Sequence, residues 1–110
     1  MKPLRFVGSA REDLSDFPDQ VRTRAGYELF MVQVGREPND WKPMSSVGPG
    51  AAEIRLRDGA GAYRVIYVAR FDEAVYVLHA FQKKTQRTTQ KDLGLAALRY
   101  RQVMALARKE

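Results

Sequence analysis

Six basic side chains in the middle of the chain are the residues whose types and spacing could do chemistry. They lie in or just after three short apolar segments, residues 51–57, 63–68 and 75–85, and they are Arg55, Arg57, Arg64, Lys83, Lys84 and Arg87. Arginine can hold two oxygens of a phosphate in fork geometry, and lysine adds a compact point charge. These residue types therefore favour a site for a phosphodiester.

The direction of the strands predicts that these cations meet. If the three segments are antiparallel neighbours, Arg57 ends the first strand where Arg64 begins the second, and Lys83 and Lys84 end the third at the same rim. Gathered cations repel one another unless an anion is bound between them. RNA carries its own nucleophile, the 2′-hydroxyl, so a basic site that stabilises charge on the phosphate could cleave it without a metal.

The usual signatures of other enzymes are missing from the sequence. There is no cysteine, which excludes disulfides, thiol nucleophiles and zinc–thiolate sites. The only histidine, His79, lies in an apolar segment, and a core or edge histidine is favoured there over a catalytic one. The sequence contains neither a phosphate-binding G-x-x-x-x-G-K-[ST] loop nor a glycine-rich dinucleotide turn. We therefore expect no metal and no cofactor.

The N-terminal third predicts a strand followed by two helices. Residues 4–7 read as a strand, and Ser9 with Glu12 has the spacing of a capping box that opens a brief helix. Pro18 is suited to begin a second helix, which the apolar spacing continues to about Gly35. The two helices form an α-hairpin that must pack on a sheet.

Residues 36–50 are rich in proline, glycine and serine and predict a loop before the sheet. Trp41 in this loop is an anchor to the core or, as a less favoured alternative, a platform for a nucleic-acid base. After the sheet, Thr88 or Thr89 caps a final helix, with Asp92 three residues beyond Thr89.

The chain length and the order of elements indicate one α+β domain over residues 1–110, in the order β-α-α-β-β-β-α. No apolar run is long enough for a membrane span, and a cytoplasmic location is expected. Residues 83–110, which include Lys91, contain eight basic and two acidic residues and therefore all of the net charge of +6. This asymmetry suggests an anionic partner, either nucleic acid or an acidic protein.

The chain resembles the RelE/HigB superfamily of bacterial toxin–antitoxin toxins, and within it the phage-derived Gp49-like HigB branch. The motifs that carry the resemblance are Asp40-Trp41-Lys42-Pro43, Glu53-Ile54-Arg55-Leu56-Arg57, Tyr63-Arg64-Val65-Ile66-Tyr67, and Val77 to Thr85 with Arg87-Thr88 behind it. The resemblance implies a RelE-like fold with antiparallel central strands, an N-terminal α-hairpin and a C-terminal helix packed on the sheet.

The resemblance also implies a function, that of a ribosome-dependent mRNA endonuclease neutralised by a HigA-like helix-turn-helix antitoxin. Carried over by position, the candidate catalytic residues are Arg57, Arg64, Lys83 and Lys84, and the candidate RNA contacts are Arg55, Arg87 and Lys91. Either Lys84 or Lys83 would protonate or stabilise the leaving 5′-oxygen.

Two departures from RelE leave the general base unassigned. Glu53 stands where RelE has a lysine, and Gln90 is the nearest counterpart of a tyrosine in its C-terminal segment. Glu53 is a candidate base, but a salt bridge with Arg55 or Arg64 is the role that the sequence favours for it.

Two other functions remain open from the sequence. A ParE-like toxin would have the same fold but would poison DNA gyrase by protein contact. A non-catalytic module would bind nucleic acid or another protein through the basic C-terminal helix. The cluster of Arg64, Lys83 and Lys84 favours the nuclease, because a gyrase-binding toxin has no need of a phosphate clamp.

Overall fold

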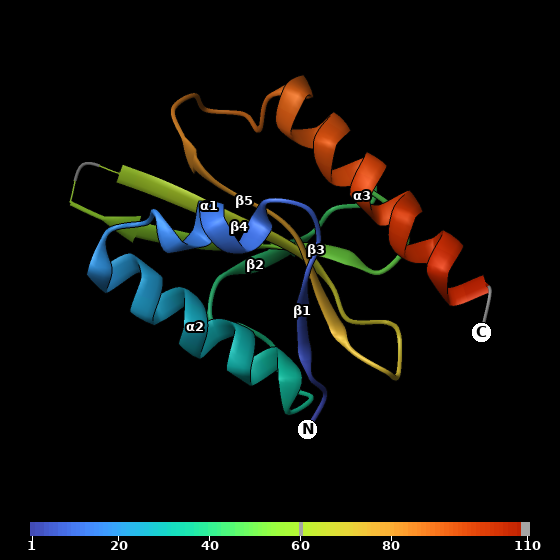
Figure 1. The fold of residues 1–110 in the computed structure, drawn as a ribbon. Helices are drawn as coiled ribbons and strands as arrows, with labels where there is room; N and C mark the ends of the chain where they lie inside the picture. The colour runs from blue at the N-terminus through green and yellow to red at the C-terminus, as the bar shows by residue number, and fades with distance from the viewer. Residues whose placement is uncertain (60, 109–110) are drawn as a thin grey trace.

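The computed structural model describes residues 1–59 and 61–108, with side chains up to residue 107. Its centre is a sheet of five strands in the order β1-β5-β4-β3-β2, in which β1 runs parallel to β5 and the other neighbours are antiparallel (Figure 1). The strands are β1 (Leu4–Phe6), β2 (Trp41–Pro43), β3 (Ala51–Asp58), β4 (Gly61–Val68) and β5 (Val75–Lys83). The antiparallel β3, β4 and β5 confirm the central sheet that the sequence predicts.

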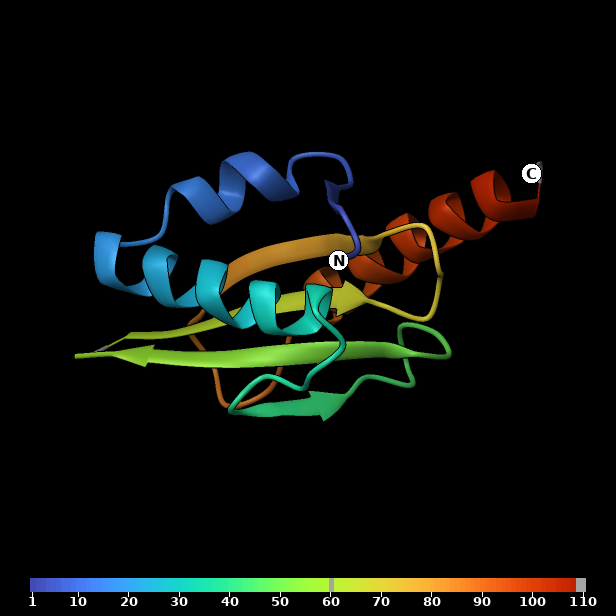
Figure 2. The ribbon, with the colours of Figure 1, turned by 90° about the horizontal axis from the view of Figure 1, so that it is seen from below.

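Three helices cover the two faces of this sheet. Helices α1 (Ala10–Ser15) and α2 (Asp19–Gln33) lie over one face, and α3 (Gln90–Arg108) lies over the other (Figures 1 and 2). On α2 the predicted apolar stripe is buried, but Phe30 is 45% exposed and does not belong to it. None of the described helices is long and apolar enough to cross a membrane.

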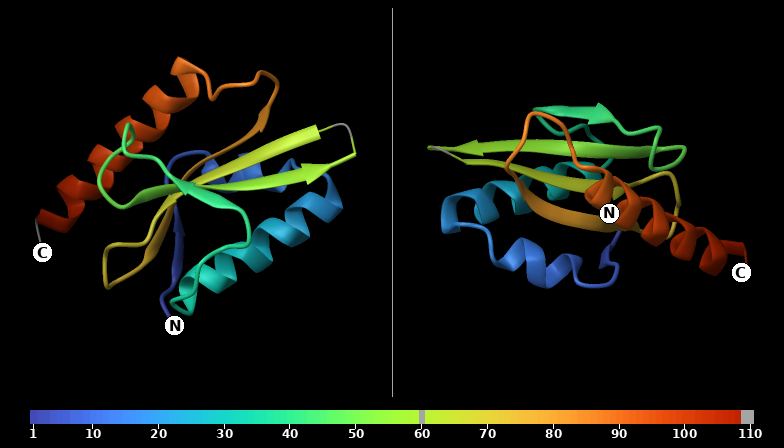
Figure 3. Two further views of the ribbon diagram at one scale, coloured as in Figure 1. Left: turned by 180° about the vertical axis from the view of Figure 1, so that it is seen from behind. Right: turned by 90° about the horizontal axis from the view of Figure 1, so that it is seen from above.

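Each face of the sheet has its own apolar core, because successive residues of a strand point to opposite sides. Ile54 and Val65 pack under α1 and α2, whereas Ile66 and Leu78 pack under α3. Helix α3 lies at the end of the sheet away from the β3–β4 hairpin tip (Figure 3). Helix α3 therefore does not cover the hairpin half of this face, where Thr88 of the segment before α3 contacts Glu53.

Strand β2 lies within residues 36–50, which were predicted to be a loop, so that prediction was wrong for residues 41–43. Residues 41–43 pair with β3, with Trp41 opposite Ile54. Trp41 packs against the core under α2, which confirms it as an anchor. A three-residue strand that ends in Pro43 shows no alternation in sequence, and proline is tolerated because the strand is at the sheet edge.

The two predicted helix caps have different outcomes. Thr89 caps α3: its Oγ1 accepts from the Asp92 amide at 3.2 Å and donates to the Asp92 carboxylate at 2.7 Å. The predicted capping box at Ser9 does not form. The Ser9 hydroxyl instead donates to Asp13 at 2.8 Å and accepts from Arg99 at 3.0 Å.

Arg99 joins α3 to the sheet from inside the protein. It is 8% exposed, and its Nη1 donates to the Leu78 carbonyl at 2.9 Å. Leu78 sits at a register shift, since Ile66 pairs with His79 and Tyr67 with Val77. The guanidinium thus satisfies a carbonyl at an irregularity of β5.

We predict that Arg99→Ala lowers the free energy of unfolding by about 3 kcal/mol, because it leaves the buried Leu78 carbonyl and the half-buried Ser9 hydroxyl without this donor. The matched control is Arg101→Ala on the exposed side of the same helix, which should change it by less than about 0.5 kcal/mol. Urea unfolding measures both. Equal losses in the two variants would contradict the internal role of Arg99.

Candidate functional site

A groove of about 650 Å³ opens at the hairpin end of the α3 face, and all four predicted catalytic cations line it. Its lining residues are Arg57, Ala62, Arg64, Lys83, Lys84, Thr85 and Gln86, and we call it the basic groove. The strand register explains the gathering, because Ala62 on β4 lies between Arg57 on β3 and Lys83 on β5. The structure therefore confirms that these four residues converge at one end of the sheet.

Arg64 lies at the base of this groove. It is only 4% exposed, with Arg55 opposite it on β3 and Phe81 opposite it on β5. Its Nη1 donates to the Tyr63 carbonyl at 3.0 Å. Arg64 therefore acts on the groove from below, whereas Arg57 and Lys84 are exposed at its rim.

Glu53 is the counter-charge beneath the groove. Its carboxylate lies 3.3 Å from Arg64 Nε and 3.7 Å from Arg55 Nε, and it accepts a hydrogen bond from Thr88 at 3.1 Å. Arg64 Nε has no hydrogen-bond partner among the described residues, so this contact is an ion pair rather than an aligned hydrogen bond. The salt bridge expected of Glu53 is confirmed.

Glu53 is buried, although it is charged and lies on the strand face that carries Arg55 and Arg57. Glu53 is 1% exposed, like a core residue. A carboxylate so enclosed and paired with two arginines is poorly placed to take a proton from a substrate. The structure therefore argues against Glu53 as the candidate base.

Burial and mutual repulsion lower the pKa of two groove cations. Burial lowers the pKa of Arg64, and Arg55 and Arg57 lower it further against the opposing effects of Glu53 and Asp40. For Lys83, burial is again the main cause of a lowered pKa, and the next is the charge of Arg64. The Lys83 amine therefore gives up its proton more readily than an ordinary lysine.

The other predicted RNA contacts lie around the groove at different distances. Arg87 joins Lys83 and Lys84 in lining a neighbouring cavity of about 150 Å³. Arg55 is beside the groove on β3, opposite Arg64. Lys91 instead lines a separate cavity of about 550 Å³ and is not brought to the basic groove.

Sequence reasoning missed Lys42 as a member of this surface. Lys42 on β2 is the register partner of Glu53 and is exposed. Its charge helps to lower the pKa of Lys83. The Asp40-Trp41-Lys42-Pro43 motif could have pointed to Lys42. Because the segment was interpreted as a loop, the sequence did not show on which face of the sheet Lys42 lies.

His79 is a core histidine, as expected. It is 6% exposed, its Nε2 lies 2.7 Å from Asp92 Oδ1, and its ring stacks on Phe81 at 4.7 Å between centroids. It pairs with Ile66, further from the hairpin than the Arg64–Phe81 pair. His79 holds the start of α3 to β5.

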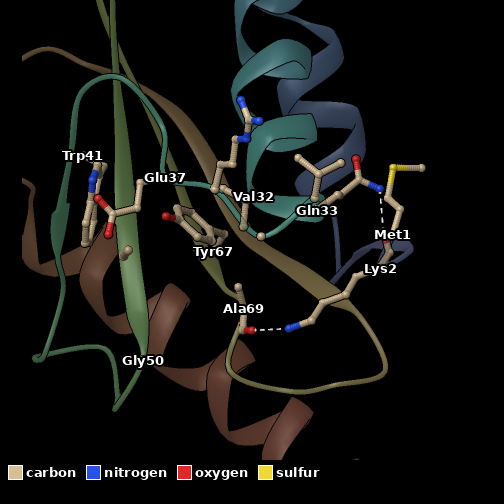
Figure 4. A pocket seen from close by; sticks show the side chains of 13 residues that line it. Met1, Lys2, Val32, Gln33, Glu37, Trp41, Gly50, Tyr67 and Ala69 are labelled. Atoms are coloured by element: carbon tan, nitrogen blue, oxygen red, sulfur yellow. Dashed lines mark hydrogen bonds between the residues drawn. The ribbon is translucent and has the colours of Figure 1, made fainter.

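A cavity of about 660 Å³ lies on the opposite face, at the end of α2 (Figure 4). Trp41, Glu37 and Tyr67 line it, and the Tyr67 hydroxyl points toward the side of the cavity where Glu37 lies. Burial and then the negative charge of Glu37 raise the pKa of Tyr67 to about 12. This cavity contains none of the predicted site residues.

We predict that Arg55→Gln raises the pKa of Lys83, because it removes a neighbouring positive charge. The control, Arg22→Gln on α2, should leave that pKa unchanged. Heteronuclear NMR titration of the lysine side chains measures both variants, and no difference between them would contradict the shared electrostatics.

The lowered pKa of Lys83 also determines whether this residue makes the fold more or less stable as the pH rises. Lys83 binds its proton less tightly in the folded chain than in the unfolded chain. The folded state is therefore favoured as pH rises from the folded-state pKa toward 10.5, the usual value for lysine.

Comparison with known proteins places the chain in a family. The curated proteins contain no match to it. Among solved structures it is similar to the E. coli toxin RelE, a double arginine-to-alanine mutant in the free state, with a TM-score of 0.65, 18% identity, and coverage of 90% of this chain and 96% of that one. This likeness confirms the RelE-like α+β fold.

Residues 12–101 match the family model described as "Phage derived protein Gp49-like (DUF891)". Because that match spans most of the sequence, the chain belongs to the phage-derived Gp49-like family.

Proposed function

We propose that this protein is the toxin of a type II toxin–antitoxin system and that it cleaves mRNA in the basic groove. The observation that supports this most directly is the composition of the groove, which four cations line and no acidic residue among the described ones does. Glu53, the carboxylate paired with Arg64 at the base of the groove, is buried. The groove therefore keeps a positive potential that suits a phosphodiester.

The chemistry that we propose uses the 2′-hydroxyl of the RNA as nucleophile. The 2′-hydroxyl gives its proton to a water molecule as its oxygen attacks the adjacent phosphorus. The bond from phosphorus to the 5′-oxygen breaks and that oxygen takes a proton from a lysine of the groove, so the products carry a 2′,3′-cyclic phosphate and a 5′-hydroxyl. Arg57 and Lys84 hold the non-bridging oxygens, and Arg64 adds positive charge from the base of the groove. These cations take the part that a metal has in other nucleases.

Lys83 is the group that we assign to the leaving 5′-oxygen. The sequence left open whether Lys83 or Lys84 has this role. The lowered pKa of Lys83 favours it, because a general acid works best when its pKa is closer to the working pH. Lys84 is then a second point charge on the same phosphate.

The partners that we propose follow from the family and the fold. The similar E. coli protein is named as a toxin. We propose that the chain acts in the cytoplasm on mRNA bound to the ribosome, and that a HigA-like helix-turn-helix antitoxin neutralises it. The cluster of four cations in the basic groove favours an mRNA endonuclease over a gyrase poison, because a gyrase poison acts by protein contact and needs no phosphate site.

We predict that Lys83→Ala with Lys84→Ala reduces mRNA cleavage at least about 100-fold, since it removes the proton donor and one phosphate contact. The matched control is Arg36→Ala with Arg101→Ala, which removes two exposed cations that lie outside the groove. The measurement is induction in cells followed by mapping of mRNA 5′ ends on translating ribosomes.

Two results would count against the proposed function. Undiminished cleavage by the double lysine variant would refute the groove as the active site. DNA damage without mRNA cleavage, in cells that express the unaltered chain, would favour the gyrase-directed alternative.

We also predict that Glu53→Gln lowers the free energy of unfolding by about 3 kcal/mol, because it leaves Arg64 buried without its counter-charge. The control Asp72→Asn, in an exposed turn, should change it by less than about 0.5 kcal/mol. Chemical denaturation measures both. A variant as stable as the unaltered chain, but with the acidic limb of its pH–rate profile abolished, would show that Glu53 is the base after all.

A further inference from the structure

The basic surface extends beyond the groove onto β2. Lys42 and Glu53 are directly opposite in the β2–β3 register, so their side chains lie on the same face of the sheet. Arg55 and Arg64 are likewise opposite each other in the β3–β4 register. Lys42 is thus on the face that carries the groove, although it lies outside the three central strands that supply the groove residues.

One cation stands on each of four neighbouring strands: Lys42 on β2, Arg55 on β3, Arg64 on β4 and Lys83 on β5. Neighbouring strands are about 4.8 Å apart, so this row crosses roughly 14 Å of the sheet. The charge of Lys42 contributes to the lowered pKa of Lys83, so the two ends of the row interact. Two carboxylates lie beside the row: Glu53 is buried, and Asp40, the residue before β2, is exposed and acts on the pKa of Arg64.

Helix α3 leaves this row uncovered. It packs over the other end of the same face, around Ile66, Val68 and Leu78. Figure 3 shows α3 and the hairpin tip at opposite ends of the sheet in both views. Lys42 is exposed and Arg55 and Lys83 are half-buried, so these three cations are accessible to a ligand longer than a single phosphate, whereas Arg64 is buried beneath it.

We propose that the RNA strand runs from the basic groove across the sheet to the β2 edge, with Arg55 and Lys42 holding phosphates on one side of the scissile bond. This inference rests on the proposed function and adds the path of the RNA to it. Cleavage takes place at the β5 rim, and the β2 edge binds the adjoining RNA backbone. Lys42 is then an RNA-binding residue that the sequence motifs did not assign.

The ligand that fits this row is a single strand of RNA. A narrow line of cations matches the backbone of one extended strand, whose successive phosphates are open to contact. The aromatic side chain on β2, Trp41, packs on the opposite face, so β2 offers no stacking platform beside Lys42. Contacts at this edge therefore go to phosphates and hold any sequence equally.

The chain contains no cysteine, so a single introduced one can be labelled without ambiguity. The experiment uses Lys42→Cys, Arg57→Cys and the control Arg101→Cys, each carrying a maleimide-linked benzophenone. Each protein is bound to ribosomes programmed with a 2′-O-methyl mRNA that cannot be cleaved by its own 2′-oxygen. Photocrosslinks to the mRNA are then mapped by primer extension.

The proposal expects crosslinks from positions 42 and 57 to nucleotides on different sides of, or at different distances from, the scissile bond, and none from position 101. In the same system, Lys42→Ala should weaken binding on the order of three-fold, as the loss of one phosphate contact does.

Three results would overturn the proposed path. Crosslinks from position 57 alone would remove the β2 edge but leave the proposed active site intact. Crosslinks from position 42 to ribosomal or antitoxin protein, with none to mRNA, would make this edge a protein-binding surface. The absence of mRNA crosslinks from both positions 42 and 57 would instead count against the proposed function itself.

Discussion

The buried ion pair between Glu53 and Arg64 is the interaction on which the site depends. Burying a single arginine on a sheet next to Arg55 and Arg57 would be unfavourable, because desolvation and repulsion act in the same direction. One carboxylate offsets both effects at close range. Since Glu53 is nearly inaccessible, it neutralises the base of the groove without neutralising the rim.

The same carboxylate connects the sheet to the segment that follows it. Thr88 donates to Glu53, and Thr89 immediately begins the cap of α3. The position of Lys83 and Lys84 is thereby fixed from both sides, by the β4–β5 pairing before them and by this contact after them. A phosphate clamp needs such support, because its cations must be held in place before the substrate arrives.

The two faces of the sheet have different tasks. The face under α1 and α2 is closed by apolar packing, whereas α3 covers only one half of the other face. Arg99 fixes that half by bonding to the Leu78 carbonyl where the register of β5 shifts. The half that α3 does not cover carries the charged residues, so the fold itself separates the stabilising region from the proposed reactive one.

The sequence was enough to predict the meeting of Arg57, Arg64, Lys83 and Lys84. That prediction needs only short turns and the alternation of strand direction, which are local properties. The final helix and its cap at Thr89 were likewise local. Convergence at one end of a hairpin sheet is therefore accessible to sequence reasoning.

Burial of charged residues could not be predicted in the same way, because it depends on distant parts of the chain. Glu53 is enclosed with the help of Thr88, 35 residues away, and Arg99 reaches Ser9 across 90 residues. Strand β2 was missed because three residues that end in proline show no period. Lys42 was missed with it, because the face of the sheet on which a side chain lies is known only when the pairing of its strand is known.

The chemical identity of the cleavage products tests the central claim most directly. Ribosomes programmed with a defined mRNA are incubated with the purified chain, and the new ends are analysed by mass spectrometry. Attack by the 2′-hydroxyl in a groove of cations predicts a 2′,3′-cyclic phosphate and a 5′-hydroxyl, and no cleavage where the reacting 2′-oxygen is methylated. A 5′-phosphate product, or cleavage of the methylated site, would contradict the account.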